Sequence, residues 1–143
     1  MKHPASLLSL GLIIALLISP SASAADPPSF DGEWRGVIRN IKKKDKQILL
    51  RIDGDSFTHF LKRDGEWRAM PATTTYFAKA GDIAVLGWIR DAGIGTEHQT
   101  FSLCYIDADT LDLVWSRHAT NRRDGEPGEP FHTPGKATLE RLQ

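Results

Sequence analysis

Two alternating stretches, FSLCY at 101–105 and LDLVW at 111–115, constrain the fold of this chain most. In each, a large apolar residue stands at every second position, which is the period of a half-buried β-strand. A three-residue loop at 107–109 would place Tyr105 opposite Leu111 and Phe101 opposite Trp115. A two-residue loop would instead pair apolar with polar side chains, which a half-buried sheet resists. We therefore expect an antiparallel hairpin in the first of these registers.

The same register predicts a polar group further along this hairpin. On the apolar face Gln99 comes opposite Arg117, with Glu97 one step beyond, and on the other face His98 meets His118. Because a buried arginine needs a paired acid, we expect an ion pair between Glu97 and Arg117. A structural pair is favoured over a catalytic one.

The rest of the chain after residue 25 shows short β-rich runs and no long stretch with helical spacing. The runs span 33–41, 47–52, 56–62, 67–70, 73–79, 83–90, 96–106, 110–119 and 136–142. Asp53-Gly54 and Asp64-Gly65 are typical of two-residue hairpin turns, while 120–135, with three prolines and three glycines, predicts a long loop. We predict an all-β protein whose residues 25–143 form a single antiparallel up-and-down β-barrel of about eight strands.

The N-terminus predicts a signal peptide over residues 1–24. Lys2 precedes an apolar run from Leu7 to Ile18, and the small residues before Ala25 suit cleavage after Ala24. An apolar run of this length is shorter than the roughly 20 residues that span a bilayer. We expect an exported protein, periplasmic or secreted, that has no membrane segment once the signal is removed.

Charge and cysteine content exclude several classes of partner and an intrachain disulfide. The chain carries 18 basic and 18 acidic residues, and loss of Lys2 leaves one more acidic than basic residue. Binding of nucleic acid or of an anionic membrane surface requires an excess of positive charge, so neither is an expected partner. The single cysteine, Cys104, excludes an intrachain disulfide.

The sequence lacks the common signatures of catalysis and metal binding. It has no G-x-S-x-G, H-E-x-x-H or P-loop motif. Cys104 lies on the outer face opposite Asp112, with no histidine in its register. His98 and His118 could share a zinc ion, but two ligands are insufficient and no third is apparent on that face. We expect no metal, no cofactor and no enzymatic activity.

The start of the first predicted strand, Gly32-Glu33-Trp34, resembles that of the lipocalins and their calycin relatives, which include avidin-like barrels. In those families a G-x-W motif opens the first strand, the tryptophan packs at the barrel floor, and a late arginine lies over it. The resemblance implies that Arg141, or alternatively Arg117, takes that place. It also implies an eight-stranded up-and-down barrel around an apolar lumen. The T-D-Y motif of lipocalins and the biotin-site pattern of avidins are not found.

Two functions remain open on the sequence. The first is non-catalytic binding of a small apolar or amphipathic molecule in the barrel mouth. The expected ligand contacts are Trp34, Trp88, Gln99, Phe101, Trp115 and Arg117. His59 is a further polar residue that could orient the ligand. The second is inhibition of a periplasmic or secreted enzyme through the 120–135 segment, with Arg122, Arg123 and Phe131 as the contacts. A small enzyme using Glu97 and Arg117 is the weakest alternative.

Overall fold

The computed structural model describes residues 28–39, 44–123 and 126–143, and only the backbone of residues 122, 123 and 127. The predicted signal peptide, 1–24, lies outside the described residues. The strands are β1 (Gly32–Ile38), β2 (Lys46–Asp53), β3 (Ser56–Arg63), β4 (Glu66–Ala69), β5 (Thr74–Ala80), β6 (Ile83–Asp91), β7 (Gly95–Asp107), β8 (Thr110–Arg123), β9 (Glu126–Pro127) and β10 (Phe131–Arg141). Within this part of the chain, no helix is long and apolar enough to cross a membrane.

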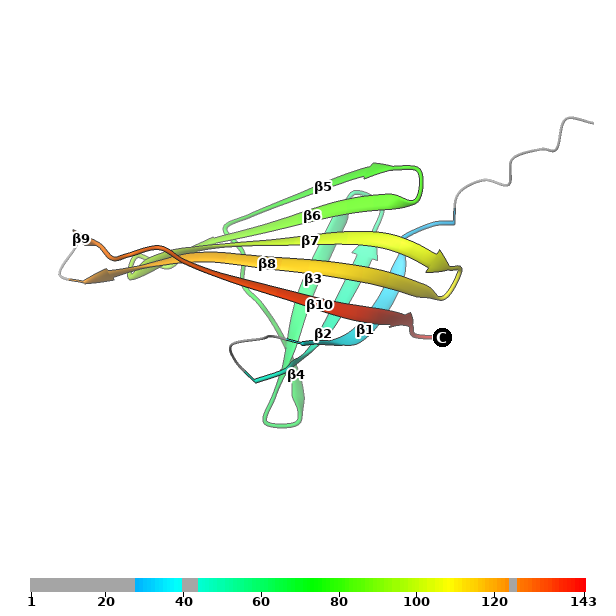
Figure 1. Ribbon diagram of the computed structural model, residues 1–143, viewed down its shortest axis with the longest axis horizontal. Helices are drawn as coiled ribbons and strands as arrows, with labels where there is room; N and C mark the ends of the chain where they lie inside the picture. Colours follow the sequence, from blue (N-terminus) through cyan, green and yellow to red (C-terminus); the bar gives the residue numbers. More distant parts are fainter. Residues whose placement is uncertain (1–27, 40–43, 124–125) are drawn as a thin grey trace, which may run out of the picture.

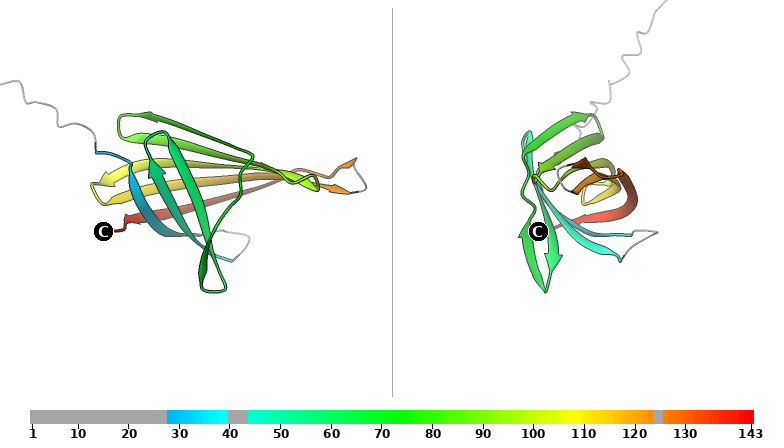
Figure 2. Two further views of the ribbon diagram at one scale, coloured as in Figure 1. Left: turned by 180° about the vertical axis from the view of Figure 1, so that it is seen from behind. Right: turned by 90° about the vertical axis from the view of Figure 1, so that its left-hand side faces the viewer.

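The strands form one antiparallel sheet in the order β4-β3-β2-β1-β10-β8-β7-β6-β5, with β9 paired to β8. Strands β1 to β4 lie next to their chain neighbours in the sheet, as do β5 to β8, and β10 lies between β1 and β8. The sheet curls around its inner face into a half-barrel (Figures 1 and 2). The predicted all-β, up-and-down architecture is confirmed, with nine strands on the main path where about eight were expected.

The half-barrel is open between β4 and β5, which do not pair with each other. A short link at 70–73 joins these two strands, and Pro71 lies within it. Proline has no N–H to donate to a ladder, so the backbone ladder does not continue through Pro71. We call this opening the seam; β5 lies near β3 across it.

The central hairpin has the predicted register. Tyr105 pairs with Leu111 and Phe101 with Trp115. The connection itself differs from the expected loop, because Asp107 pairs with Thr110 and a bulge lies between Tyr105 and Asp107. A bulge adds one residue to one strand, so it shifts the register by the same amount as the third loop residue would.

The long loop predicted at 120–135 is wrong. β8 continues to Arg123 and β10 already begins at Phe131, and Phe131 pairs with Ala119. The inward positions of this part of β10 are Thr133 and Gly135. A Cβ on Gly135 would meet the side chains of Ile38 and Trp115, so the core allows only a small residue there. Small inward residues hide the apolar alternation that marks a strand.

One continuous apolar core fills the inner face of the half-barrel. Its largest fully buried side chains are Trp34, Trp88, Trp115, Phe101, Ile38, Ile48, Leu50, Leu86, Leu103, Leu111, Leu113 and Leu139. Every strand from β1 to β3, and β6, β7, β8 and β10, contributes to this cluster. Four of the six residues expected to line a ligand cavity therefore belong to this core, and a fifth, Gln99, is buried as well.

Candidate functional site

A polar group lies on the inner face where β7 and β8 run side by side. Gln99 on β7 pairs in register with Arg117 on β8, and Glu97 lies one inward position further along β7. Period-two alternation places all three side chains on the same face as Phe101 and Trp115. The sequence prediction of this grouping is confirmed.

Four side chains of this group form an unbroken chain of hydrogen bonds. The Trp115 indole N–H donates to the Gln99 side-chain oxygen (2.8 Å), and the Gln99 amide donates to Glu97 Oε1 (2.6 Å). Arg117 donates from Nε to Glu97 Oε1 (2.6 Å) and from Nη2 to Oε2 (3.1 Å). This two-bond fork fixes both charged groups in one orientation. One amide proton of Gln99 and the indole proton of Trp115 therefore already have acceptors.

The predicted ion pair is partly buried, with side-chain exposures of 20% for Arg117 and 18% for Glu97. Burial alone would raise the pKa of the Glu97 carboxyl, but hydrogen bonds and charge from Arg117 outweigh it and lower that pKa. The carboxylate is therefore ionised at neutral pH. A hollow of about 120 Å³ adjoins the pair, and residues at the start of β7 and the far end of β8 line it.

His59 on β3 is the polar residue buried most deeply inside the half-barrel, with 1% of its surface exposed. Its ring packs edge-on against Phe101 (4.9 Å between centroids) and Trp88 (6.2 Å). Neither ring nitrogen has a hydrogen-bond partner among the described residues. Desolvation lowers the pKa of His59 to about 3, so the imidazole is neutral, with one donor and one acceptor unused.

The seam passes directly beside His59. The Met70 N–H donates to the His59 carbonyl (2.8 Å), and the Trp88 indole N–H donates to the Met70 carbonyl (3.2 Å). The side chain of Met70 also packs against the core from this side. The 70–73 link thus covers the inner face next to His59 and Trp88.

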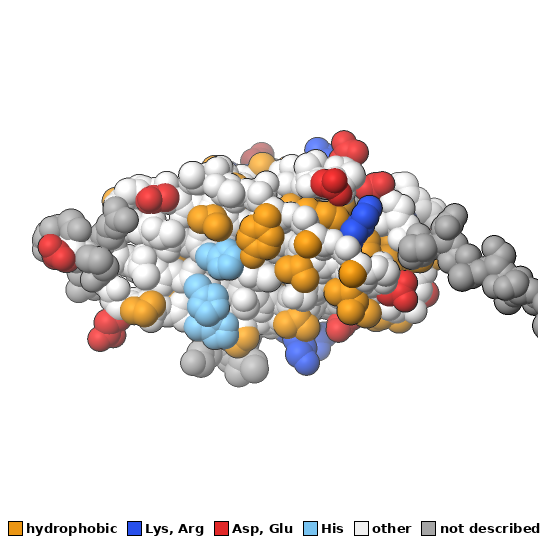
Figure 3. Space-filling view, turned by 90° about the horizontal axis from the view of Figure 1, so that it is seen from above, with side chains coloured by type: hydrophobic (Ala, Val, Ile, Leu, Met, Phe, Trp, Pro, Cys, Tyr) orange, Lys and Arg blue, Asp and Glu red, His pale blue; other side chains and the backbone are white. Residues whose placement is uncertain are grey.

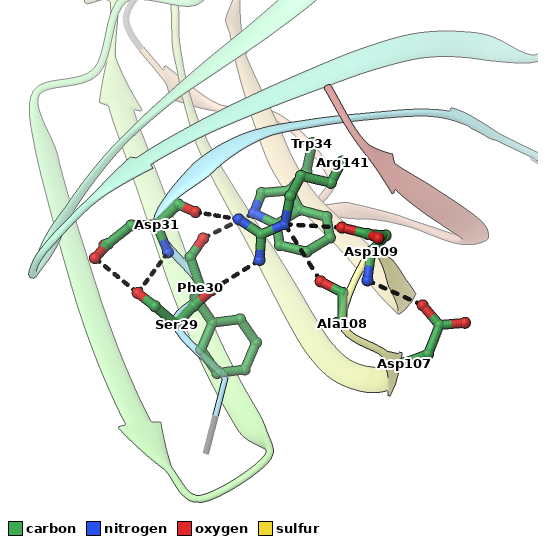
Figure 4. A network of polar contacts seen from close by, with 8 residues as sticks. All are labelled: Ser29, Phe30, Asp31, Trp34, Asp107, Ala108, Asp109 and Arg141. Carbon is green, nitrogen blue, oxygen red and sulfur yellow. Dashed lines mark hydrogen bonds and ion pairs between the residues drawn. The ribbon is translucent and has the colours of Figure 1, made fainter. Parts of the chain in front are cut away.

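Trp34, another of the predicted ligand contacts, lies apart from this group at the opposite end of the half-barrel. Its indole N–H donates to the Phe30 carbonyl (2.7 Å), and the Arg141 guanidinium lies over its ring, 4.1 Å from the centroid (Figure 4). Of the two arginines that the resemblance offered, Arg141 is the one over Trp34. Arg117 instead lies over the Phe131 ring (5.0 Å).

The three residues predicted as a protein-contact surface fall on the extended β8–β10 hairpin rather than on a loop. The side chains of Arg122 and Arg123 lie outside the described part of the structure. Phe131 begins β10 and is half-buried beneath Arg117. In Figure 1 this hairpin projects beyond the other strands at the end where β9 lies.

A larger hollow, of about 610 Å³, lies on the outer face instead of the inner one. Basic side chains outnumber acidic ones along it, and Trp67 is its aromatic residue; the charged lining residues are Arg35, Arg39, Lys62, Lys136, Asp112 and Glu140. None of the predicted ligand contacts lines this groove. Sequence reasoning missed it because it depends on the curvature of β1, β3 and β10 relative to one another.

Two other features were missed or only partly predicted from the sequence. His132 joins His98 and His118 on the outer face, because β10 starts earlier than predicted. The contact between Met70 and the core was also missed, because it joins residues that are distant in the sequence. In the described ranges no group of three or more His, Cys, Asp or Glu side chains is arranged to hold a metal ion.

Comparison with known proteins adds no assignment. No protein-family profile matches this sequence, and no curated protein matches it significantly. The fold and the site geometry are therefore the basis for any functional proposal.

Proposed function

We propose that this protein is an exported, non-catalytic binding protein that takes a small amphipathic molecule on the inner face of the half-barrel, beside the seam. The observation that carries the proposal is His59, a buried imidazole whose two nitrogens have no partner in the part of the chain that the structure describes. Buried polar groups are paired in the great majority of cases, and an unpaired one costs about 1–3 kcal/mol. A ligand that accepts from one ring nitrogen and donates to the other would offset that cost.

The surroundings of His59 suit an amphipathic ligand. Phe101 and Trp88 offer aromatic surface next to the imidazole. Beyond them the Glu97–Arg117 pair, only partly buried, supports a polar head group near solvent. Most ligand sites in proteins combine such apolar walls with a few fixed polar groups.

The seam supplies the entry path in this proposal. Two hydrogen bonds involving Met70 hold one end of the 70–73 link over His59 and Trp88, and at the other end the Thr73 N–H donates to the Ile89 carbonyl (2.7 Å). Because β4 and β5 share no ladder, movement of the link breaks few backbone bonds. Displacement of the Met70 side chain would open space in contact with the imidazole, in a core that is otherwise filled.

A relationship to the calycins is part of the proposal. The supporting features are the G-x-W motif at the start of β1, the Arg141 guanidinium over Trp34, and the return of β10 beside β1. In such barrels one end is closed and the other receives the ligand. Trp34 and Arg141 would then mark the closed end, with the Glu97–Arg117 group towards the open one.

Native mass spectrometry of the mature protein, purified from the periplasm of its own host, tests the proposal directly. We expect a small-molecule adduct that disappears in His59→Phe, which keeps an aromatic ring but removes both polar nitrogens. Trp67→Ala, in the outer groove, is the matched control and should keep the adduct. Loss of the adduct in Trp67→Ala alone would move the site to the groove, and a bare wild-type mass would contradict the proposal.

A second candidate function, inhibition of an exported enzyme, is favoured by the projecting β8–β10 hairpin (Figure 1). Its base is fixed by Arg117 over Phe131, which would present Arg122 and Arg123 on a stable support. Co-purification of an enzyme with the mature protein, lost in Arg122→Ala/Arg123→Ala, would support this function. Co-purification unchanged by that double variant would contradict it.

A further inference from the structure

Three histidines lie side by side on the outer face, one on each of three adjacent strands. His118 on β8 pairs in register with His98 on β7 and with His132 on β10. The His118 and His132 rings stack with 4.4 Å between centroids, and those of His98 and His118 with 6.5 Å. The pale blue side chains in Figure 3 show this row on the surface.

The row of three histidines is accessible to solvent, and at one end His98 contacts Tyr76. His118 and His132 are exposed, and His98 is half-buried. The Tyr76 hydroxyl on β5 lies 3.0 Å from His98 Nε2, and the Thr100 hydroxyl lies 3.4 Å from the same nitrogen. Tyr76 reaches across β6 because Gly87, its partner in register, has no side chain; any Cβ there would collide with the tyrosine ring.

We propose that His98, His118 and His132 together bind one divalent transition-metal ion of the class that prefers imidazole, such as Zn²⁺ or Ni²⁺. Neighbouring strands lie about 4.8 Å apart, and a zinc–imidazole bond measures about 2.0–2.1 Å. A metal ion above His118 is therefore within reach of an imidazole from the strand on either side. Three histidines with water in the remaining position form a known type of zinc coordination.

The stacked rings must turn for the metal to bind. As they lie, their nitrogens do not converge, and the described residues contain no preformed set of three ligands. Rotation about the side-chain torsions of His118 and His132 is open because both are exposed. The metal–nitrogen bonds replace a ring stack and water contacts, so no buried packing is lost.

Tyr76 is a positioning residue in this site. When His98 carries its proton on Nε2, the Tyr76 oxygen accepts it, and the lone pair of Nδ1 is left for the metal. Such outer contacts commonly fix the tautomer and ring orientation of metal-binding histidines. The site lies on the opposite face of the sheet from His59, so it is independent of the ligand proposal.

Calorimetric titration of the untagged mature protein with ZnCl₂ and with NiCl₂ tests the proposal. We expect one ion per chain and a loss of affinity of about tenfold or more in His118→Gln, whose side chain is central to the row. His98→Gln and His132→Gln should each weaken binding as well. Asp112→Asn, exposed on the same face of β8, is the control and should leave affinity unchanged.

Nuclear magnetic resonance of the imidazole nitrogens gives a second readout. On addition of Zn²⁺ we expect signals from His98, His118 and His132 to shift while those of His59 stay in place. Tyr76→Phe should weaken zinc binding without changing the 1:1 stoichiometry. Absence of saturable binding to the wild type, or binding that His118→Gln leaves unchanged, would overturn the proposal.

Discussion

The guanidinium of Arg141, on the last strand, lies over the indole of Trp34, on the first, with 4.1 Å between the guanidinium carbon and the ring centroid. The same group donates to the carbonyls of Asp31 (2.6 Å), Ser29 (2.9 Å) and Ala108 (3.2 Å). One side chain therefore joins the segment before β1, the β7–β8 turn and β10 at this end of the half-barrel (Figure 4).

Arg141→Met should destabilise the protein by about 2–3 kcal/mol, because hydrogen bonds to a charged group and a cation–π contact are lost together. The stability of Arg141→Lys should lie between those of the wild type and Arg141→Met, since lysine keeps the charge but not the planar fork of donors. Urea unfolding of the mature protein measures both. Arg63→Met, at an exposed end of β3, is the control, expected within about 0.5 kcal/mol of wild type; an equal effect of the two methionine variants would contradict the prediction.

The acid sensitivity of the fold should depend on His59. Its pKa is about 3 in the folded protein, lowered by desolvation from 6.5. Between those two pH values the unfolded chain binds one more proton, so the free energy of unfolding falls as the pH is lowered, by up to about 1.4 kcal/mol per pH unit. We expect His59→Phe to lose this contribution, whereas the carboxylates titrate alike in both proteins.

Urea unfolding of ligand-free wild type and His59→Phe at several pH values from 6.5 to 4 measures that difference. The wild-type stability should decline more steeply with acid, and the two curves should diverge as the pH falls. Parallel curves would show that the imidazole is solvated or already protonated in the folded state.

The Glu97–Arg117 pair should behave as a coupled unit in a double-mutant cycle. Arg117→Met leaves the Glu97 charge partly buried without its main partner, which should cost about 2–3 kcal/mol. Glu97→Gln leaves the guanidinium unpaired in turn. The double variant should lose less than the sum of the two, with a coupling energy of about 1 kcal/mol or more. Additive losses would show that solvent screens the pair, in spite of the two-bond geometry.

The parts of the fold that the sequence predicts well are those in which a local pattern determines the geometry. Alternation of large residues set the β7–β8 register, and with it the pairing of Gln99 and Arg117. The Asp64-Gly65 turn has positive φ at both residues, as a two-residue hairpin turn of type I′ requires. These features depend on neighbours in the chain and on the period of two.

The parts that the sequence does not predict depend on contacts between distant residues. β10 was predicted five residues too short because Thr133 and Gly135 are small where Ile38 and Trp115 fill the space. Because of that error, the sequence does not predict His132 on the same face as His98 and His118. The absence of partners around His59 follows from the packing of three strands, which no local pattern records.

Gly36→Ala should be the most damaging single-methyl substitution on β1. β1 pairs with β10 through Trp34, Arg35 and Gly36, and a Cβ on Gly36 would collide with the backbone oxygen of Thr138 and the side chain of Leu139. Because a backbone oxygen within a ladder cannot move aside, the strands must separate, and we expect a loss of about 1–3 kcal/mol. Val37→Ala, which removes a half-exposed side chain at the next position, should cost less. Thermal unfolding should give a lower midpoint for Gly36→Ala than for Val37→Ala, since about 1 kcal/mol shifts the midpoint of a domain of this size by several degrees. Equal midpoints would mean that β1 and β10 tolerate a wider spacing, and that the contact of Arg141 with Trp34 does not require their close approach.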